Sequence, residues 1–298
     1  MRTTKRFTPA VLRRFARQGR GTGTFGEYQA WHQVSRGDPA SRGRSHIVCW
    51  RDFQLDLLSD KEKTLFLLAS MRQDVVDARA QFPLALDTSS HELEAYGEIR
   101  LARYPGIAQL ASELKIRAPK LREGDDQAPW VSTTDLLLTV EQAPGVFAFI
   151  AVAFKYAREL AAKRTKQLLQ LEREYWLRRG VQWLMVTEAL FDRRYAECLE
   201  RVWWWALHCP VDNETLRNTA AIICRAAGQT QLHAIKQVAR RTGDPMVAQH
   251  AFWQAIWCGA APVDLRRGWR PHVPVHVLSV DGFRSLNPIL CGRSAWIG

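Results

Sequence analysis

Two apolar runs joined by a tight turn occupy residues 132–155, which read STTDLLLTVEQAPGVFAFIAVAFK. The runs at 132–140 and 146–154 are rich in β-branched and large apolar residues, which favour strands. The intervening residues 141–145 end in a Pro-Gly pair, which is typical of a turn. We therefore expect two adjacent strands joined as a hairpin.

A helix and a further strand are predicted after the hairpin. Residues 157–179 are rich in Lys, Arg, Leu and Glu, and they end before Gly180, a residue type that commonly terminates helices. Residues 181–186 form a short apolar run, which favours a buried strand. The order of strand, helix and strand predicts an α/β fold with a mixed sheet as its core.

The residues before the hairpin predict three helices and three extended segments. Thr8-Pro9 marks the start of an amphipathic helix that ends near Gln18. Ser59 and Glu62 have the spacing of a capping box, in which a hydroxyl and a carboxylate bond reciprocally to amides at a helix start. A helix should therefore begin at Ser59. The remaining elements are extended segments at 47–50, 53–58 and 75–86, and a short helix at 105–114.

The chain changes character beyond about residue 190. Helical patterns run through four segments, at 192–208, 212–227, 230–241 and 245–258. Residues 272–278 then alternate between apolar and polar types, as a strand would. Helices followed by a β-ribbon are consistent with a winged-helix module. We therefore expect one domain at 1–190, with a basic N-terminal arm, and a winged-helix-like α+β domain at 191–298.

The composition is that of a globular protein, and 298 residues are enough for two domains. There is no run of about 18 apolar residues, and the Arg-rich residues 1–20 contain no apolar signal core. The sequence thus predicts a soluble cytoplasmic protein. Six cysteines without a CxxC pair argue against a zinc ribbon or a redox motif. We expect reduced thiols that are mostly buried.

The charge distribution favours nucleic acid as a partner. Lys and Arg number 42 against 30 Asp and Glu, which gives a net charge of +12. Residues 1–51 carry 11 basic and 2 acidic side chains, and residues 155–179 carry 8 and 3, whereas residues 52–154 are net negative. Basic flanks suit phosphates, and an acidic middle suits metal-binding carboxylates. A generally Arg-rich proteome is the alternative explanation.

Glu62, Asp135 and Lys155 are the residues of the middle region that could carry chemistry. Glu62 is expected in the first turn of a helix, Asp135 on the first strand of the hairpin, and Lys155 at the end of the second. Phosphodiester hydrolysis needs a metal ion that neutralises the phosphate and lowers the pKa of an attacking water. Carboxylate oxygens suit Mg²⁺, and a nearby lysine can balance charge in the transition state.

Each of the three residues also has a purely structural interpretation. Glu62 can be the partner of the Ser59 cap, and Asp135 can accept hydrogen bonds from backbone amides at a strand end. Lys155 can be the first basic residue of the helix that follows. The spacing alone does not separate these interpretations from the catalytic one.

Three other patterns favour structural roles over functional ones. The GxGxxG at residues 21–26 follows a helix rather than a strand, so a flexible basic turn is favoured over dinucleotide binding. The tryptophans at 203–205 are interpreted as core or interface residues rather than as a platform for nucleic-acid bases. His272 and His276 lack the paired spacing of a zinc site.

A set of motifs occurs in order within the first 190 residues. They are Gly19-Arg-Gly21 with Tyr28 and Trp31, Gly43-Arg-Ser-His46, Leu57-Leu-Ser-Asp-Lys-Glu62, Gln81-Phe-Pro-Leu84, Ser132-Thr-Thr-Asp135, Lys155, Arg164-Thr165 and Leu171-Glu-Arg-Glu-Tyr-Trp176. Together they resemble the catalytic domain of the TnsA family, the restriction-endonuclease-like subunits of heteromeric cut-and-paste transposases. The C-terminal third is similar only in its order of helices and ribbon.

The resemblance implies a Mg²⁺-dependent endonuclease, with two ions expected, that cuts double-stranded DNA at the 5′ ends of a transposon. It implies two protein partners: the DDE transposase TnsB, which cuts and joins the 3′ ends, and the AAA+ regulator TnsC, which docks on the C-terminal region. It also implies that Glu62 and Asp135 are metal-site residues, that the carbonyl of Phe154 is a further ligand, and that Lys155 is the active-site lysine.

Position 153 departs from this pattern. The family has Gln at this position and related nucleases have Glu, whereas this chain has Ala153. Alanine has no side-chain oxygen, so one metal contact is missing and cleavage should be impaired. An engineered inactivation is favoured over a naturally weak site, because the other signature residues are present. Ala153 and Lys155 are expected on one face of their strand, since strand side chains alternate.

Two other functions are consistent with the sequence. The first is a non-catalytic subunit that binds DNA and bridges proteins in a transposition complex, and Ala153 favours it. The second is a stand-alone restriction or repair nuclease, which would cut specific sequences without partners. The geometry of Glu62, Asp135 and Lys155 separates a nuclease site from three unrelated structural residues.

Overall fold

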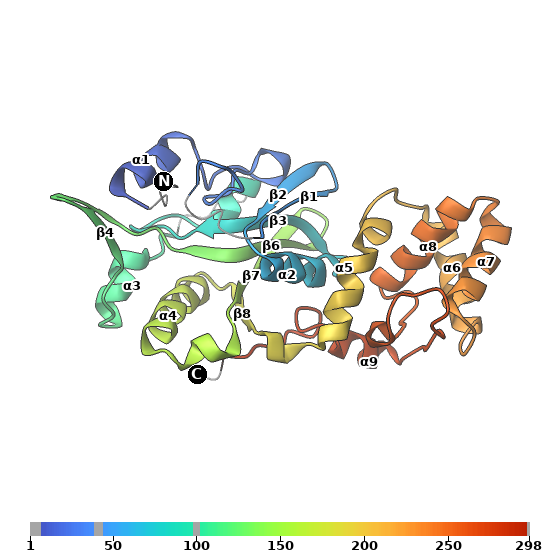
Figure 1. The fold of residues 1–298 in the computed structure, drawn as a ribbon. Helices are drawn as coiled ribbons and strands as arrows, with labels where there is room; N and C mark the ends of the chain where they lie inside the picture. Colours follow the sequence, from blue (N-terminus) through green and yellow to red (C-terminus); the bar gives the residue numbers. More distant parts are fainter. Residues whose placement is uncertain (1–6, 39–43, 98–101, 297–298) are drawn as a thin grey trace, which may run out of the picture. The chain divides into compact units, whose positions relative to one another are not determined.

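The computed structural model describes residues 7–38, 44–97 and 102–296. The chain divides into two compact units (Figure 1). The first unit combines the described residues up to Lys63 with those of Asp74–Val186 and with Trp296. The second unit combines Thr64–Gln73 with Thr187–Ala295. Residues 1–6 of the predicted basic arm and Gly43 of the motif set lie outside the described residues.

A four-stranded mixed sheet forms the centre of the first unit, as the sequence predicts. Its strands lie in the order β3 (Val75–Pro83), β6 (Thr133–Ala143), β7 (Val146–Phe154) and β8 (Gln182–Val186). Strand β6 pairs antiparallel with β3 and with β7, and β8 runs parallel to β7. The predicted hairpin is therefore confirmed as β6 and β7, and the α/β core is confirmed with it.

The centre of the sheet is buried on both faces. Leu136, Leu137 and Leu138 follow one another on β6, and all three are at most 1% exposed. Successive strand residues point to opposite faces, so a run of three buried residues means that both faces are covered. Strands β6 and β7 thus form a buried, apolar base for the polar residues at their ends.

The single helix predicted at 157–179 is wrong in its first turn. Residues Ala157–Ala161 form a short 3-10 turn, and helix α4 spans Lys163–Arg178. Ala162 is extended, with φ −75° and ψ 124°, which separates the two. The Glu159 carboxylate accepts a 2.8 Å hydrogen bond from the backbone amide of Tyr156, and this contact fixes the separate turn. Helix α4 then connects β7 to the parallel strand β8.

The N-terminal elements match the sequence-based expectations. Helix α1 (Pro9–Arg17) begins at Thr8, whose hydroxyl accepts a hydrogen bond from the amide of Val11. Strands β1 (His46–Trp50) and β2 (Phe53–Leu57) pair antiparallel. Leu12, Phe15 and Trp31 pack together as a small core under α1.

The glycine-rich turn after α1 packs against the end of β3. Gly21 has φ +82°, and a Cβ there would lie 2.2 Å from Cγ of Pro83. Only glycine satisfies both this conformation and this close approach. Gly21 of the GxGxxG pattern is thus required by the backbone conformation and the packing of this turn.

One hairpin of the first unit is not predicted from the sequence. Strands β4 (Lys120–Glu123) and β5 (Asp126–Pro129) pair antiparallel across Gly124 and Asp125. They follow helix α3 (Ile107–Glu113), which the sequence does predict. The two strands are short, polar and largely exposed, so they lack the apolar alternation that signals a strand.

The second unit is helical. Its helices after residue 187 are α5 (Arg193–Leu207), α6 (Asn213–Arg225), α7 (Gln231–Thr242), α8 (Pro245–Trp257) and α9 (Val280–Ser285). The last two turns of helix α2 (Asp60–Ser70) also belong to this unit, whereas its first turn belongs to the first unit. Helix α8 contacts α5, α6 and α7, and its residues Phe252 and Ala255 are fully buried. The four predicted helices are confirmed.

The ribbon of the predicted winged helix is not found. Within the described residues, 272–278 take part only in the isolated bridges Thr230↔Pro274 and Val263↔Val277. Pro274 lacks a backbone donor, so it interrupts the ladder that a β-ribbon needs. The winged-helix description of the C-terminal region is therefore not confirmed.

The burial of the cysteines and tryptophans differs in part from the sequence-based expectations. Cys198 is buried, whereas four of the other five cysteines of the chain are exposed, so the expectation of mostly buried thiols is wrong. Trp253 and Trp257 belong to the core, but Trp204 is 54% exposed and stacks on His208 with ring centroids 3.9 Å apart. No helix in the described part of the chain is long and apolar enough to cross a membrane.

Candidate active site

Three neighbouring strands place Gln81, Asp135 and Ala153 in one row across the sheet. Gln81 on β3 lies opposite Asp135 on β6, and the register continued by one residue places Asp135 opposite Ala153 on β7. Side chains opposite one another point to the same face. The register follows from the pairs Ala80↔Leu136, Phe82↔Thr134 and Leu136↔Val152.

Glu62 enters this site from the first turn of helix α2, and it also caps that helix. The amide of Glu62 donates to the Ser59 hydroxyl at 3.3 Å, while the Glu62 carboxylate accepts from that hydroxyl and from the amide of Leu58. Burial, reinforced by the charge of Asp135, raises the pKa of Glu62 to about 7. The structural interpretation of Glu62 as the partner of the Ser59 cap is therefore confirmed, and the same carboxylate shares Gln81 as a hydrogen-bond partner with Asp135.

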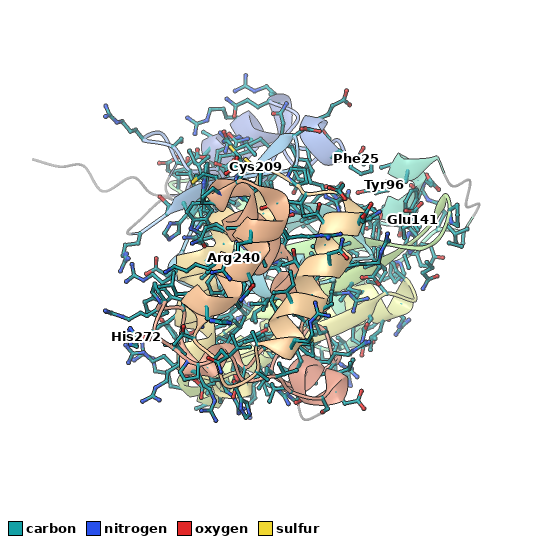
Figure 2. All side chains as sticks on the ribbon, turned by 90° about the vertical axis from the view of Figure 1, so that its right-hand side faces the viewer. Phe25, Tyr96, Glu141, Cys209, Arg240 and His272 are labelled. Carbon is teal, nitrogen blue, oxygen red and sulfur yellow. The ribbon has the colours of Figure 1, made fainter. Side chains whose placement is uncertain are left out.

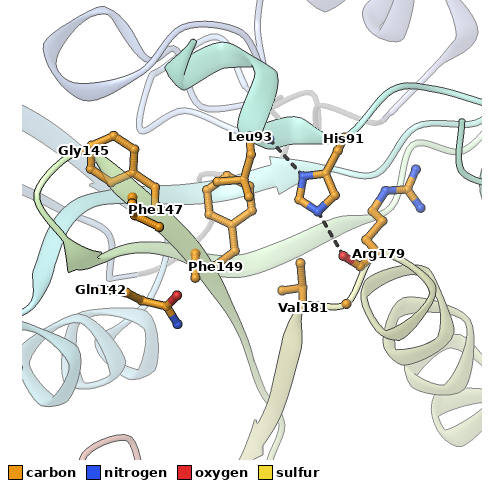
Figure 3. Close-up of a pocket in the computed structure, with 11 residues that line it drawn as sticks. His91, Leu93, Gln142, Gly145, Phe147, Phe149, Arg179 and Val181 are labelled. Carbon is orange, nitrogen blue, oxygen red and sulfur yellow. Dashed lines mark hydrogen bonds between the residues drawn. The ribbon is translucent and has the colours of Figure 1, made fainter. Parts of the chain in front are cut away.

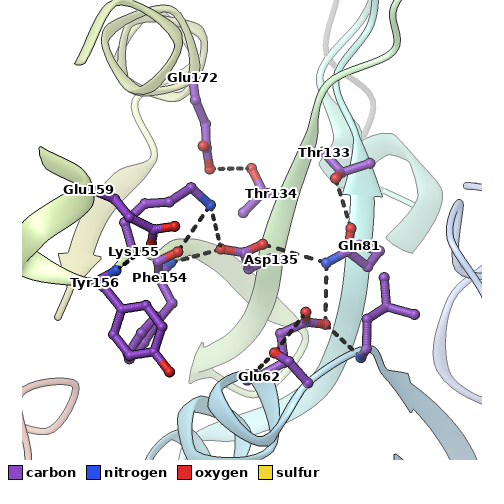
Figure 4. A network of polar contacts seen from close by, with 12 residues as sticks. Glu62, Gln81, Thr133, Thr134, Asp135, Phe154, Lys155, Tyr156, Glu159 and Glu172 are labelled. Carbon is purple, nitrogen blue, oxygen red and sulfur yellow. Dashed lines mark hydrogen bonds and ion pairs between the residues drawn. The ribbon is translucent and has the colours of Figure 1, made fainter. Parts of the chain in front are cut away.

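Asp135 is held by hydrogen bonds from both neighbouring strands (Figure 4). Its Oδ2 accepts a 2.8 Å hydrogen bond from the backbone amide of Phe154, and its Oδ1 accepts from Nε2 of Gln81 at 3.4 Å. Its side chain is 17% exposed. The carboxylate is thus fixed from both neighbouring strands but still reaches solvent.

The amide of Gln81 joins the two carboxylates. Its Nε2 donates to Oε2 of Glu62 at 3.2 Å as well as to Asp135, and its Oε1 accepts a 2.8 Å hydrogen bond from the hydroxyl of Thr133. Gln81 is 5% exposed and has φ +51°, a left-handed conformation that is uncommon for a residue with a side chain. Sequence reasoning did not assign Gln81 to the site, although its position opposite Asp135 follows from pairing β3 with β6.

Lys155 closes the site at the end of β7. Its Nζ donates to the carbonyl of Phe154 at 3.0 Å and lies 3.7 Å from Oδ2 of Asp135. The charge of Asp135 raises the pKa of Lys155, so the ammonium form is favoured. The structure thus brings together Glu62, Asp135, Lys155 and the Phe154 carbonyl. Ala153 lies in the same row, 1% exposed and without a polar side-chain atom.

Comparison with known proteins shows what this part of the chain is similar to. Residues 72–188 match the family model described as TnsA-like endonuclease N terminal. We refer to these residues as the TnsA-like domain. It is 31% identical over 184 residues to the Escherichia coli protein "Transposon Tn7 transposition protein TnsA", and the alignment covers 61% of this chain and 58% of that protein.

The TnsA-like domain contains most of the site. Gln81, Asp135, Ala153 and Lys155 lie inside the matched residues, and Glu62 precedes them by ten residues. The chain spans less than two thirds of the length of the Tn7 protein.

The oxygen atoms of the site fit a hard divalent cation. Glu62 and Asp135 offer carboxylate oxygens, and Phe154 offers a carbonyl oxygen. Such oxygen donors suit Mg²⁺, which keeps several of its own waters and is usually bound by one or two carboxylates. Within the described residues, no group of three or more His, Cys, Asp or Glu side chains could hold a metal ion. Two carboxylates must therefore be complemented by neutral oxygens or water.

A second buried carboxylate of the TnsA-like domain lies behind Asp135. Glu172 on α4 accepts a 2.9 Å hydrogen bond from the hydroxyl of Thr134, which in turn accepts from the indole of Trp176 at 2.7 Å. Burial, with a smaller contribution from Asp135, raises the pKa of Glu172 to about 7. Sequence reasoning missed Glu172, because a Glu inside a charged helix is usually solvated.

A pocket of about 450 Å³ lies elsewhere in the same domain and does not include the carboxylates (Figure 3). Its lining includes His91, Phe149 and Arg179. The ring of His91 bonds the amide of Leu93 at 3.1 Å and the carbonyl of Arg179 at 3.0 Å, so both ring nitrogens are engaged. The pocket offers no free catalytic group, and the chemistry of the domain is better assigned to the row at Asp135.

Proposed function

We propose that this protein is the DNA endonuclease subunit of a transposase, which hydrolyses phosphodiester bonds at the 5′ ends of a transposon. A DDE transposase of the TnsB type would cut the 3′ ends, and a TnsC-type AAA+ regulator would be a further partner. The observation that carries the proposal is the convergence of Glu62, Asp135 and Lys155, of which Asp135 and Lys155 lie inside the residues that match TnsA-like endonucleases.

The chemistry follows from the residues of the site. Glu62, Asp135 and the Phe154 carbonyl are the groups that would hold Mg²⁺. The ion would supply charge neutralisation at the scissile phosphate and a lowered pKa for the attacking water. Lys155, kept protonated by Asp135, is placed to stabilise negative charge that develops on the phosphate oxygens.

The start of helix α4 supports DNA as the substrate. Lys163, Arg164 and Lys166 are exposed in its first turns, and the first turn contains no acidic residue. Cations at a helix N-terminus oppose the helix dipole, each at a cost of about 0.3–1 kcal/mol. A phosphate backbone bound there would offset this cost through both the side chains and the free helix amides. These residues follow Lys155 by only 8 to 11 positions.

Ala153 should make the site weaker than one with Gln or Glu at the same position. Loss of a single group that supports a metal site typically costs about 10–100-fold in affinity or activity. We therefore expect slow cleavage by this chain rather than the rate of a site with an oxygen at position 153.

A strand-specific cleavage assay tests the proposal. Transposon-end DNA labelled at the 5′ side of the element would be incubated with Mg²⁺, the partner transposase and this protein. Asp135→Asn should remove cleavage, whereas Asp126→Asn should retain it, because Asp126 is an exposed residue paired with Arg13. Equal product from the two variants would contradict the proposal.

A non-catalytic bridging subunit is the alternative that a specific observation favours. Ala153 is buried beside Asp135 and offers no ligand atom. This alternative predicts that Asp135→Asn changes neither DNA binding nor the assembly of the transposition complex, and that no variant at position 153 produces 5′ cleavage.

A further inference from the structure

Gln81 and Ala153 flank Asp135 on opposite sides of the same row. Position 153 carries no oxygen, whereas Gln81 has an amide within 3.2 Å of Glu62 Oε2 and within 3.4 Å of Asp135 Oδ1. We propose that Gln81 supplies the cation of this site with the side-chain oxygen that position 153 lacks, reaching it from β3 instead of β7. The inference rests on the proposed metal-dependent function.

The contacts of Gln81 show that its amide already occupies the space between the carboxylates. Its NH₂ group faces Glu62 and Asp135 and lies between the two carboxylates. A cation bound by the same carboxylates would face the same amide. The NH₂ group would then oppose the cation, so the amide must present its oxygen instead.

A half-turn of the terminal amide of Gln81 achieves this exchange without loss of partners. Oε1 now accepts from the hydroxyl of Thr133 at 2.8 Å. After the half-turn Nε2 would face that hydroxyl, which can accept a hydrogen bond as readily as it donates one. Thr133 thus supports either orientation, and the oxygen of Gln81 becomes available to the site.

The backbone at Gln81 also favours a role in the site. A left-handed residue inside a strand is strained, and such residues persist where the surroundings hold them in place. Here the carbonyl of Gln81 accepts from the amide of Trp31 at 3.3 Å, and the side chain is 5% exposed. The strained conformation holds the side chain among the carboxylates.

Mn²⁺ binding to the full chain, measured by isothermal titration calorimetry in the absence of DNA, tests the assignment directly. Gln81→Met keeps the length of the side chain but removes the amide, and Mn²⁺ affinity should fall by about tenfold or more. Gln81→Met combined with Ala153→Gln should recover most of that affinity, because an oxygen returns from the other flank. Gln81→Glu should bind Mn²⁺ more tightly than the unchanged chain. Gln142→Met, at an exposed position on β6, is the matched control and should change nothing.

The outcomes distinguish a failure of the Gln81 assignment from a failure of the proposed function. If Gln81→Met and Gln81→Glu both bind Mn²⁺ like the unchanged chain while Asp135→Asn abolishes binding, the assignment of Gln81 is overturned and the proposed function stands. If the unchanged chain does not bind Mn²⁺ at millimolar concentration, both are overturned. Thermal melting of each variant with and without Mn²⁺ shows whether the variant is folded. Gln81→Glu is expected to gain Mn²⁺ affinity, and a gain of affinity cannot result from loss of folding.

Discussion

The backbone amide of Phe154 donates a 2.8 Å hydrogen bond to Oδ2 of Asp135. This bond joins the catalytic candidate on β6 to the last residue of β7, directly before Lys155. The same carboxylate oxygen lies 3.7 Å from Nζ of Lys155. The position of the lysine relative to the carboxylate is therefore set by the ladder between two strands, which is more precise than placement on a loop.

Glu172 should make the stability of the protein depend on pH. Its pKa is raised from 4.5 to about 7 by burial, so the folded state binds the proton more tightly than the unfolded state. The stabilisation is complete below pH 4.5 and is lost as pH rises through 7. The loss is on the order of 3 kcal/mol. Glu172→Gln keeps the hydrogen bond to Thr134 and should flatten the dependence, as measured by urea unfolding from pH 4.5 to 8. An unchanged slope in this variant would contradict the assignment.

Glu62 should make cation binding depend on pH in the opposite direction. Its pKa of about 7 means that the proton competes with the cation below neutral pH. Mn²⁺ affinity should therefore rise as pH increases from 6 to 8, by up to about tenfold per unit on the acid side. Calorimetric titration at several pH values gives the measurement. A Glu62→Gln variant should bind weakly at every pH, and a flat profile in the unchanged chain would show that Glu62 does not face the cation.

The sequence predicts some residues of the site and misses others. The hairpin at 132–155 and the capping box at Ser59 follow from local patterns, so Asp135, Lys155 and Glu62 could be named in advance. Gln81 and Glu172 could not, because their roles depend on which strands pair and on which face of α4 is buried. The ribbon expected at 272–278 is not found for a local reason, since Pro274 lacks the backbone N–H that a strand ladder needs.

The basic start of α4 should contribute to DNA affinity. Reversing three charges with Lys163→Glu, Arg164→Glu and Lys166→Glu should weaken binding at low salt by at least tenfold and reduce the salt dependence of the affinity. Fluorescence anisotropy with a labelled duplex at several salt concentrations measures both. The matched control reverses Lys115, Arg117 and Lys120, which are exposed in the same unit. Equal losses in both triple variants would indicate a general charge effect instead of a DNA contact at α4.

Gly21 should be needed for the stability of the first unit. Alanine there would combine a φ of +82° with a Cβ 2.2 Å from Pro83, which follows Gln81 by two residues on β3. We expect Gly21→Ala to destabilise the protein by at least about 1 kcal/mol, which thermal or urea unfolding detects. Gly97 has a similar φ of +87°, and no atom of the described residues lies within 4 Å of a Cβ placed there, so Gly97→Ala isolates the backbone contribution. If the two variants lose the same stability, the contact with Pro83 is unimportant.

Position 153 provides the most direct test of the nuclease assignment. Mg²⁺-dependent cleavage of the 5′ strand at transposon ends would be compared between this chain and Ala153→Gln, with the partner transposase present and DNA binding measured in parallel. We expect slow cleavage by the unchanged chain and cleavage about tenfold faster or more by Ala153→Gln, and Asp135→Asn should abolish both. Intact DNA binding with no cleavage by either protein would contradict the account and identify the chain as a bridging subunit.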